Sequence, residues 1–299
     1  MVYIAGRGHS GTTLLGALLG SAPGVFDTGE LISGLRRYDG KCSCGEHISK
    51  CPTWDNMRRC FDVNSSTDFD TAASQLREST HIKRFLSTYF ARPSNTTFRA
   101  LARHNAQIIK CLAQSSYSYI IDSSKELTRS LFLAKFENNC KIIYLTRHPA
   151  NILDSVYRRL DNGSGEKFLR RRYRPTKLYF PFLLLSLFSW IAGHALFLLT
   201  YRQRPAAFLI IRYEDLILDP VNELTRIENF TGIDLERAKN NIRHGHHFDI
   251  GCTIAGNAFR HNKQFCFNPK KAHIRHLPKR YTFLAAFFAF PFLKKFGHI

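Results

Sequence analysis

Residues 2–19 of the chain read VYIAGRGHSGTTLLGALL. The apolar run Val2–Ala5 predicts a short buried strand, and the apolar residues Leu14–Leu19 predict a helix. The glycine-rich segment Gly6–Thr13 connects the two. The unpaired amides of a first helical turn and the helix dipole attract anions, and glycine lets the backbone approach a ligand closely. The sequence therefore predicts a phosphate-binding turn between the first strand and the first helix.

The spacing of this turn is that of the P-loop of nucleotide triphosphatases, with Gly6 and Gly11 separated by four residues. Thr12, however, stands where the P-loop has lysine. We also identify no acidic residue of the Walker-B kind, since Thr146 and Arg147 end one predicted strand and Arg212 ends another. The charge-neutralising lysine and the metal ligand are therefore both missing, which argues against binding of Mg-ATP.

Short apolar runs alternate with helical patterns along the rest of the chain. Strands are predicted at Val2–Ala5, Tyr119–Asp122, Lys141–Thr146 and Ala207–Arg212. Helices are predicted at Thr12–Ser21, Asp70–Ala91, Phe98–Ser115, Glu126–Glu137, Pro149–Leu160, Phe182–Arg202, Pro220–Phe230 and Tyr281–Leu293. This order predicts an α/β fold with a P-loop-like central parallel sheet and helices on both faces. We expect one domain over residues 1–299, with a Cys-rich inserted loop at about residues 40–64.

The composition excludes some classes of protein and indicates the charge of the partner. Of 299 residues, 44% are apolar and 22% charged, so the chain can bury a core and is not intrinsically disordered. Lys and Arg number 43 against 23 Asp and Glu, a formal net charge of +20. Such a surplus favours an anionic partner: nucleic acid, a phosphate-rich cofactor, an acidic glycan or membrane headgroups.

Four of the eight cysteines fall within nineteen residues, at Cys42, Cys44, Cys51 and Cys60. Their spacing differs from the paired C-x2-C turns of zinc knuckles and ribbons. Three interpretations stay open at this point: a local group of free thiols, one or two disulfides, or a structural metal. We assign no metal ligand from the sequence.

The segment Leu178–Thr200 has no Lys, Arg, Asp or Glu and is long enough to cross a membrane. Its proline, glycine and histidine, and the strand-like segments on both sides, favour a helix that is buried or rests on a membrane. The preceding basic residues would meet anionic headgroups, so residues 170–200 are a candidate for peripheral membrane contact. No signal peptide is visible. We expect a cytoplasmic, membrane-associated protein, or a Golgi-lumen protein if the chain is eukaryotic and lacks its anchor.

Several motifs occur together in order along the chain. They read HSGTTLL (9–15), CPTW (51–54), DSSK (122–125), IIYLTRHP (142–149) with Ser155, RYEDL (212–216) with Asp219-Pro220, GNAFR (256–260) and LKKFG (293–297). In this combination the chain resembles the sulfotransferases that use 3′-phosphoadenosine 5′-phosphosulfate (PAPS), especially bacterial-type members. Some positions are similar to those of tyrosylprotein and carbohydrate sulfotransferases. The resemblance extends from residue 2 to about residue 298.

The resemblance implies how PAPS is bound. The phosphosulfate would lie on the turn, at Arg7, Gly8, His9, Ser10, Gly11, Thr12 and Thr13. Arg147 and Ser155 would bind the 3′-phosphate, because arginine supplies a charge-assisted pair of donors and serine a short hydroxyl donor. Arg159, Tyr213, Asn257 and Arg260 match family positions around the nucleotide. No metal is expected to take part.

The resemblance also implies catalytic roles. Glu30 matches the glutamate that removes the acceptor's proton in tyrosylprotein sulfotransferases, and Lys125 matches a lysine that reaches the sulfate. His9 stands where the family has Arg or Lys, and a neutral imidazole brings no charge. We expect Lys125 and His9 to share charge stabilisation, with His148, His246 and His247 as alternative bases. Ordinary structural roles for Glu30 and Lys125 stay open: a helix-start acid and a solvated cation.

The expected function is therefore transfer of a sulfuryl group from PAPS to a hydroxyl acceptor, which is a glycan, a peptide or a small molecule. The basic charge is compatible with an acidic glycan, an acidic peptide or no special acceptor charge, so the sequence does not select the acceptor; no nucleic-acid partner is expected. Two alternatives stay open at this point. One is a P-loop kinase-like phosphotransferase, and the other a basic protein with a degenerate nucleotide fold that binds nucleic acid or a membrane surface.

Overall fold

The computed structural model describes residues 1–36, 40–113, 117–161, 179–256, 258–269 and 276–299. Its central feature is a five-stranded parallel sheet in the order β2-β3-β1-β4-β5. The strands are β1 (Val2–Gly6), β2 (Val25–Asp27), β3 (Tyr119–Lys125), β4 (Lys141–Thr146) and β5 (Phe208–Arg212). The predicted α/β fold with a central parallel sheet is confirmed.

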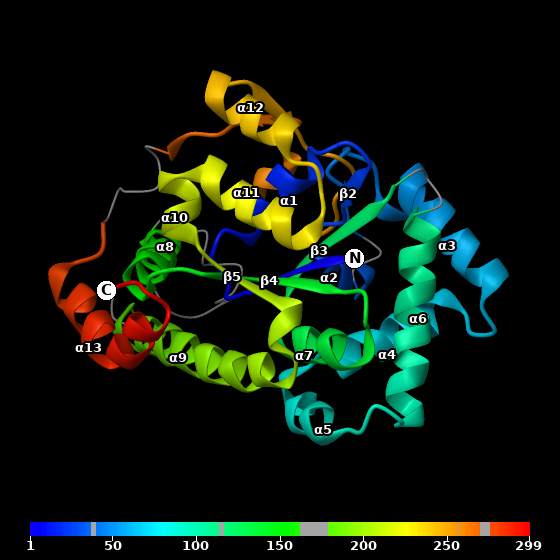
Figure 1. Cartoon of the computed structure of the whole chain (residues 1–299), viewed down its shortest axis with the longest axis horizontal. Helices are drawn as coiled ribbons and strands as arrows, with labels where there is room; N and C mark the ends of the chain where they lie inside the picture. The colour runs from blue at the N-terminus through cyan, green and yellow to red at the C-terminus, as the bar shows by residue number, and fades with distance from the viewer. Residues whose placement is uncertain (37–39, 114–116, 162–178, 257, 270–275) are drawn as a thin grey trace.

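Apolar residues on both faces of each strand explain why helices cover both sides of the sheet. Along β1, Tyr3 and Ala5 belong to one buried cluster, whereas Val2 and Ile4 belong to another. Successive side chains of a strand point to opposite faces, so an uninterrupted apolar strand must be covered twice. Figure 1 shows α1, α11 and α12 on one side of the sheet and α7 and α9 on the other.

Thirteen α-helices are assigned within the described residues. They are α1 (Thr12–Gly20), α2 (Leu31–Arg36), α3 (Pro52–Asn64), α4 (Phe69–Ser79), α5 (Phe85–Phe90), α6 (Thr96–Ala113), α7 (Leu127–Phe136), α8 (Pro149–Asp161), α9 (Tyr179–Gln203), α10 (Tyr213–Leu218), α11 (Pro220–Thr231), α12 (Glu236–His244) and α13 (Lys279–Lys295). A separate antiparallel pair joins β6 (His247–Asp249) to β7 (Gln264–Cys266).

Two predicted elements were wrong in extent. The predicted helix Asp70–Ala91 is interrupted, because the Thr80 hydroxyl caps the Arg77 carbonyl at 2.8 Å and His81 is extended. The inserted loop predicted for residues 40–64 ends at Cys51, since α3 begins at Pro52 and buries Trp54 and other apolar residues in the core. The three-residue strand β2 was missed.

Helix α9 is a core helix of the fold. Phe180–Gln203 has a mean hydropathy of 2.1 and is long enough to cross a membrane by length and composition. Trp190, His194 and Phe197 are nevertheless buried, and the Phe197 ring stacks on Tyr144 of β4 with ring centres 3.5 Å apart. This packing favours the buried helix over a membrane span.

His194 holds α9 to β4 in its neutral form. Its Nδ1 donates to the Trp190 carbonyl at 2.9 Å, which leaves Nε2 to accept from the Thr146 hydroxyl at 2.8 Å. The side chain is buried, and burial lowers its pKa to about 3. Protonation would remove the acceptor that Thr146 uses and would place a charge in the core.

We therefore predict that acid destabilises the fold through His194. The unfolded-state pKa is near 6.5, so the stabilisation is complete above that pH and is lost as pH falls toward the folded-state pKa of about 3. Between pH 7 and pH 5 this residue should account for about 2 kcal/mol of lost unfolding free energy.

Urea unfolding at the two pH values measures this loss. His194→Gln should show a smaller decrease than the unmodified chain, whereas substitution of the exposed His81 by Gln should leave the decrease unchanged. Equal decreases for the His194 variant and the unmodified chain would contradict the assignment.

Candidate active site

The candidate site lies along the carboxyl edge of the sheet. The turn Gly6–Thr13 follows β1, Glu30 comes shortly after β2, and Lys125 ends β3. Arg147 follows β4 directly and Tyr213 follows β5. Because all five strands are parallel, their carboxyl ends meet at one edge, which is where ligands bind in open α/β sheets. The fold thus brings together residues that the sequence analysis selected separately.

The turn is tight and has strict backbone requirements. Gly11 is the N-cap of α1 and has φ 97°, which is in the left-handed region. A Cβ atom at this position would lie 2.4 Å from the ring of Tyr213. The first helical hydrogen bond joins the Leu15 amide to the Gly11 carbonyl at 3.1 Å, so the Thr12, Thr13 and Leu14 amides precede it. The turn can therefore offer main-chain donors to an anion.

The pair predicted to bind the 3′-phosphate meets the turn at His9. An Nη1 donor of Arg147 binds the His9 carbonyl at 2.8 Å, and the Ser155 hydroxyl and His9 Nδ1 share a hydrogen bond of 3.0 Å. His9 has φ 68°, an uncommon backbone conformation for a residue other than glycine. Contacts from β4 and α8 thus hold the turn in this strained conformation.

Arg147 is a partly buried cation with unused hydrogen-bonding capacity. Its guanidinium stacks on Tyr213 at 4.2 Å from the ring centre. The Nε donor is buried without a hydrogen-bond partner, and no carboxylate of the described residues forms an ion pair with Arg147. Burial lowers its pKa, with only partial compensation from Tyr213 and nearby carboxylates. An anion at this point would satisfy both the charge and the free donor.

An aromatic cleft adjoins the same tyrosine. It has a volume of about 740 Å³, and Leu14, Tyr213, Phe259, Phe265 and Phe267 are among its lining residues. This volume lies within the usual range for small-molecule sites, and flat aromatic side chains suit a planar ring. The cleft and Arg147 thus flank Tyr213 as an apolar and a cationic surface.

Glu30 and Lys125 form an ion pair between Oε1 and Nζ. Both side chains are largely enclosed, with 16% and 23% of their surface exposed. The Glu30 amide donates to the Ile254 carbonyl at 3.0 Å, and the preceding Gly29 has φ 70° with no room for a Cβ beside that carbonyl. The proposed base and the proposed cation are therefore in direct contact.

Two acidic residues near this pair were missed from the sequence. Glu126 follows Lys125, and its side chain is partly exposed. Loss of hydration beside the surrounding protein raises its pKa most, and the negative charge of Glu30 raises it further. Asp27 ends β2, accepts the Gly29 amide at 3.0 Å, and has its pKa raised to about 7 by burial. Asp27 was not considered as an acid at a strand end because β2, with three residues, was too short to be recognised.

Other selected residues have different surroundings. The Arg7 side chain is directed toward α9, where it binds the Ser189 hydroxyl, and burial lowers its pKa. Arg260 donates to the carbonyls of Lys41 and Thr253 at 2.8 and 3.2 Å. Arg159 lies on α8, but its side chain and the whole of Asn257 are outside the described residues.

The histidines named as alternative bases lie in two places. The His148 amide binds Glu214 at 3.0 Å, next to Arg147. His246 and His247 are exposed; His246 lies between α12 and β6, and His247 begins β6. The carboxylate of Glu30 is therefore better enclosed than the latter two imidazoles.

A family model described as the sulfotransferase family matches residues 2–237. The fold is similar to that of sulfotransferase STF9 from Mycobacterium avium, with a TM-score of 0.51, 12% identity, and coverage of 98% of this chain and 76% of that chain. No curated protein matches the sequence.

Two further structures are sulfotransferase domains. The domain from the Synechococcus PCC 7002 olefin synthase has a TM-score of 0.48 and 19% identity, covering 97% of this chain and 94% of that chain. The domain from the curacin biosynthetic pathway has a TM-score of 0.46 and 18% identity, covering 94% and 88%.

Proposed function

This chain belongs to the sulfotransferase family, and we propose that it transfers a sulfuryl group from PAPS to a hydroxyl group of an acceptor. The observation that carries this proposal is Arg147, a guanidinium beside the phosphate-binding turn that has a buried free donor and no carboxylate partner among the described residues. A kinase would instead need the P-loop lysine that Thr12 replaces.

The residues present fit a nucleotide with two separate anionic groups. The main-chain donors of the turn would hold the phosphosulfate, and Arg147 with Ser155 would hold the 3′-phosphate. The adenine would lie in the aromatic cleft beside Tyr213, whose ring already contacts Arg147. One tyrosine would thereby position the phosphate-binding arginine and the base together.

PAPS supplies the sulfuryl group when bound. The bond between its sulfur and the bridging phosphate oxygen breaks as the acceptor oxygen bonds to sulfur. Glu30 is the residue that would take the acceptor's proton, since its carboxylate lies at the carboxyl edge of the sheet. Lys125, in contact with Glu30, and His9 on the turn would stabilise the negative charge that develops.

The charge of the chain supports a proposal about the acceptor. A net charge of +20 raises the local concentration of anionic molecules. We therefore propose an acidic glycan or an acidic peptide with a free hydroxyl as the acceptor, in preference to a neutral small molecule.

The first prediction concerns the 3′-phosphate. Arg147→Ala should weaken binding of 3′-phosphoadenosine 5′-phosphate by roughly 2–3 kcal/mol, because a charge-assisted contact is lost. Binding of adenosine 5′-phosphosulfate, which lacks the 3′-phosphate, should change much less. Isothermal titration calorimetry measures both affinities.

Arg103→Ala, at an exposed position of α6, is the control and should leave both affinities unchanged. If Arg147→Ala weakens both ligands equally, Arg147 does not recognise the 3′-phosphate.

The second prediction concerns proton removal. Glu30→Gln keeps the size of the side chain but removes its basicity, so kcat should fall by about 10²–10⁴ while nucleotide affinity stays nearly constant. Turnover is measured as release of 3′-phosphoadenosine 5′-phosphate with an acceptor that the unmodified enzyme uses.

Glu78→Gln, at an exposed position of α4, controls for a general effect of the substitution. Near-normal turnover by Glu30→Gln would exclude Glu30 as the base and direct attention to the adjacent Glu126.

The surface of α9 and α13 supports a further proposal about the partner. Leu185 and Phe188 on α9 and Phe283, Phe287 and Phe290 on α13 are each at least half exposed, and we call them the aromatic patch. The rings of Phe188 and Phe288 lie 5.8 Å apart, which joins the two helices. Neither helix contains an acidic residue, and Lys and Arg flank α13 at both ends. We propose that this patch rests on an anionic membrane surface.

Sedimentation with phosphatidylserine-containing vesicles tests the aromatic patch. The chain should bind these vesicles and bind neutral phosphatidylcholine vesicles more weakly, and Phe283→Ser with Phe287→Ser should lower binding by about tenfold. Phe90→Ser on α5, equally exposed, should not. Absence of vesicle binding, with self-association in ultracentrifugation, would show that a second copy covers the patch instead.

A further inference from the structure

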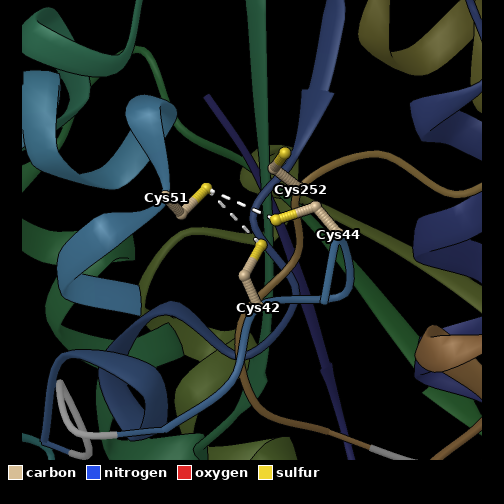
Figure 2. Close-up of side chains that lie close together, drawn as sticks. All are labelled: Cys42, Cys44, Cys51 and Cys252. Carbon is tan, nitrogen blue, oxygen red and sulfur yellow. Dashed lines mark hydrogen bonds between the residues drawn. The ribbon is translucent and has the colours of Figure 1, made fainter. Parts of the chain in front are cut away.

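Four cysteine sulfur atoms converge beside the active site. The Sγ atoms of Cys42, Cys44, Cys51 and Cys252 all lie within 4.8 Å of one another (Figure 2). Cys60 is near the first three of these cysteines in the sequence, but it is bonded to Cys111 in a disulfide. Cys252, some 200 residues away in the sequence, takes the fourth position. We name these four residues the thiol cluster.

The spacing of the sulfurs suits one tetrahedral metal ion. Cys51 Sγ lies 3.7 Å from both Cys44 Sγ and Cys42 Sγ. In a tetrahedral zinc site with Zn–S bonds of about 2.3 Å, neighbouring sulfurs are about 3.8 Å apart by geometry. We propose that the thiol cluster binds one Zn²⁺ ion as a closed structural site, with the thiol protons released to solvent.

The loop that carries the first two ligands is shaped by its own backbone. The Cys42 amide binds the Glu46 carbonyl at 2.9 Å, and the Gly45 amide binds the Cys42 carbonyl at 3.1 Å. Gly45 has φ 98°, a conformation that favours glycine. This tight turn places Cys42 and Cys44 on the same side, and Figure 2 shows both directed toward Cys51.

The third ligand begins a helix. Cys51 is the N-cap residue of α3 and is fully buried. The start of the helix fixes the position of this residue, and its sulfur lies 3.7 Å from those of Cys42 and Cys44.

The fourth ligand is aligned by hydrogen bonds on both of its sides. Ser43, between Cys42 and Cys44, donates its amide to the Thr253 carbonyl at 3.0 Å and accepts the Thr253 amide at 2.8 Å. Its hydroxyl also donates to the Gly251 carbonyl. Cys252 therefore lies between two residues, Gly251 and Thr253, that both bind Ser43. These hydrogen bonds hold the segment of Cys252 beside the loop of Cys42 and Cys44 without a metal.

A pair of disulfides is the main alternative occupant of this geometry. Disulfides would divide the sulfurs into two close pairs, whereas Cys51 is equally distant from two partners. The convergence of four sulfurs on one point therefore favours a single ion. Tetrahedral sulfur ligation also suits iron, and metal analysis distinguishes the two.

The thiol cluster also supports the position of Glu30, a step that rests on the proposed function. Ile254, two residues after Cys252, donates its amide to the Thr28 carbonyl at 2.9 Å and accepts the Glu30 amide at 3.0 Å. The segment that carries the fourth zinc ligand therefore borders the turn that presents the proposed base. Loss of the ion should loosen that turn.

Metal analysis of the untagged chain tests the proposal. Protein purified from zinc-supplemented cells should contain about one zinc per chain by mass spectrometry. Cys44→Ser, at an exposed ligand, and Cys252→Ser should lose most of the zinc, whereas Cys266→Ser, an exposed cysteine outside the cluster, should retain it. Cobalt substitution of the unmodified chain should give the spectrum of a tetrahedral tetrathiolate site.

Three results would overturn the zinc assignment: no bound metal, iron in place of zinc, or a disulfide among the four cysteines in a peptide map without reduction. If a variant fails to fold, the metal content and cobalt spectrum of the unmodified chain still decide. The link to Glu30 is separate: folded, zinc-free Cys44→Ser should lose about tenfold in kcat. Unchanged kcat overturns that link alone, and an inactive chain with bound zinc overturns the proposed function alone.

Discussion

The contact between Gly11 and the ring of Tyr213 is the constraint on which the site depends. Gly11, the N-cap residue of α1, has a left-handed conformation, and the ring leaves no room for a Cβ atom. Arg147 contacts the same ring: its guanidinium stacks on Tyr213 and also binds the His9 carbonyl. The segments that follow β1, β4 and β5 thereby meet at one aromatic ring. The conformation of the turn and the orientation of the phosphate-binding cation are thus set together.

Much of this edge was predictable because its determinants are local in the sequence. A strand, a glycine turn and a helix start identify the phosphate-binding turn from residues 2–19 alone. Arg147 and Ser155 are eight residues apart, so one strand end and one helix place both near His9. The alternation of apolar strands and helices predicts the parallel sheet. The residues that follow each strand then lie together at its carboxyl edge.

The features that escaped prediction depend on contacts between distant segments or on very short elements. Cys252 joins Cys42 across 210 positions, and no local pattern marks it as the partner in place of Cys60. Strand β2 has three residues, too few for a period of two to be visible, so Asp27 was not recognised as a strand end. The direction of the Arg7 side chain depends on the space that Gly193 leaves on α9.

Contacts between distant segments also hold the turn that presents Glu30. Strand β2 lies at the edge of the sheet and pairs with β3 through Val25, Phe26 and Asp27. The turn after this strand is held by β3 on one side, where the Thr28 amide binds the Ile121 carbonyl at 2.9 Å and the Ser123 amide binds the Gly29 carbonyl at 2.8 Å. A general base must be placed within a fraction of an ångström, so the other side needs support as well. The bridge between Gly29 and Ile254 supplies a neighbour on the open side. That neighbour is an irregular segment and has to be held in place itself. Ser43 binds the Thr253 amide, and Cys252 of the thiol cluster directly precedes Thr253. The position of Glu30 thus depends on β3 on one side and on a segment outside the main sheet on the other.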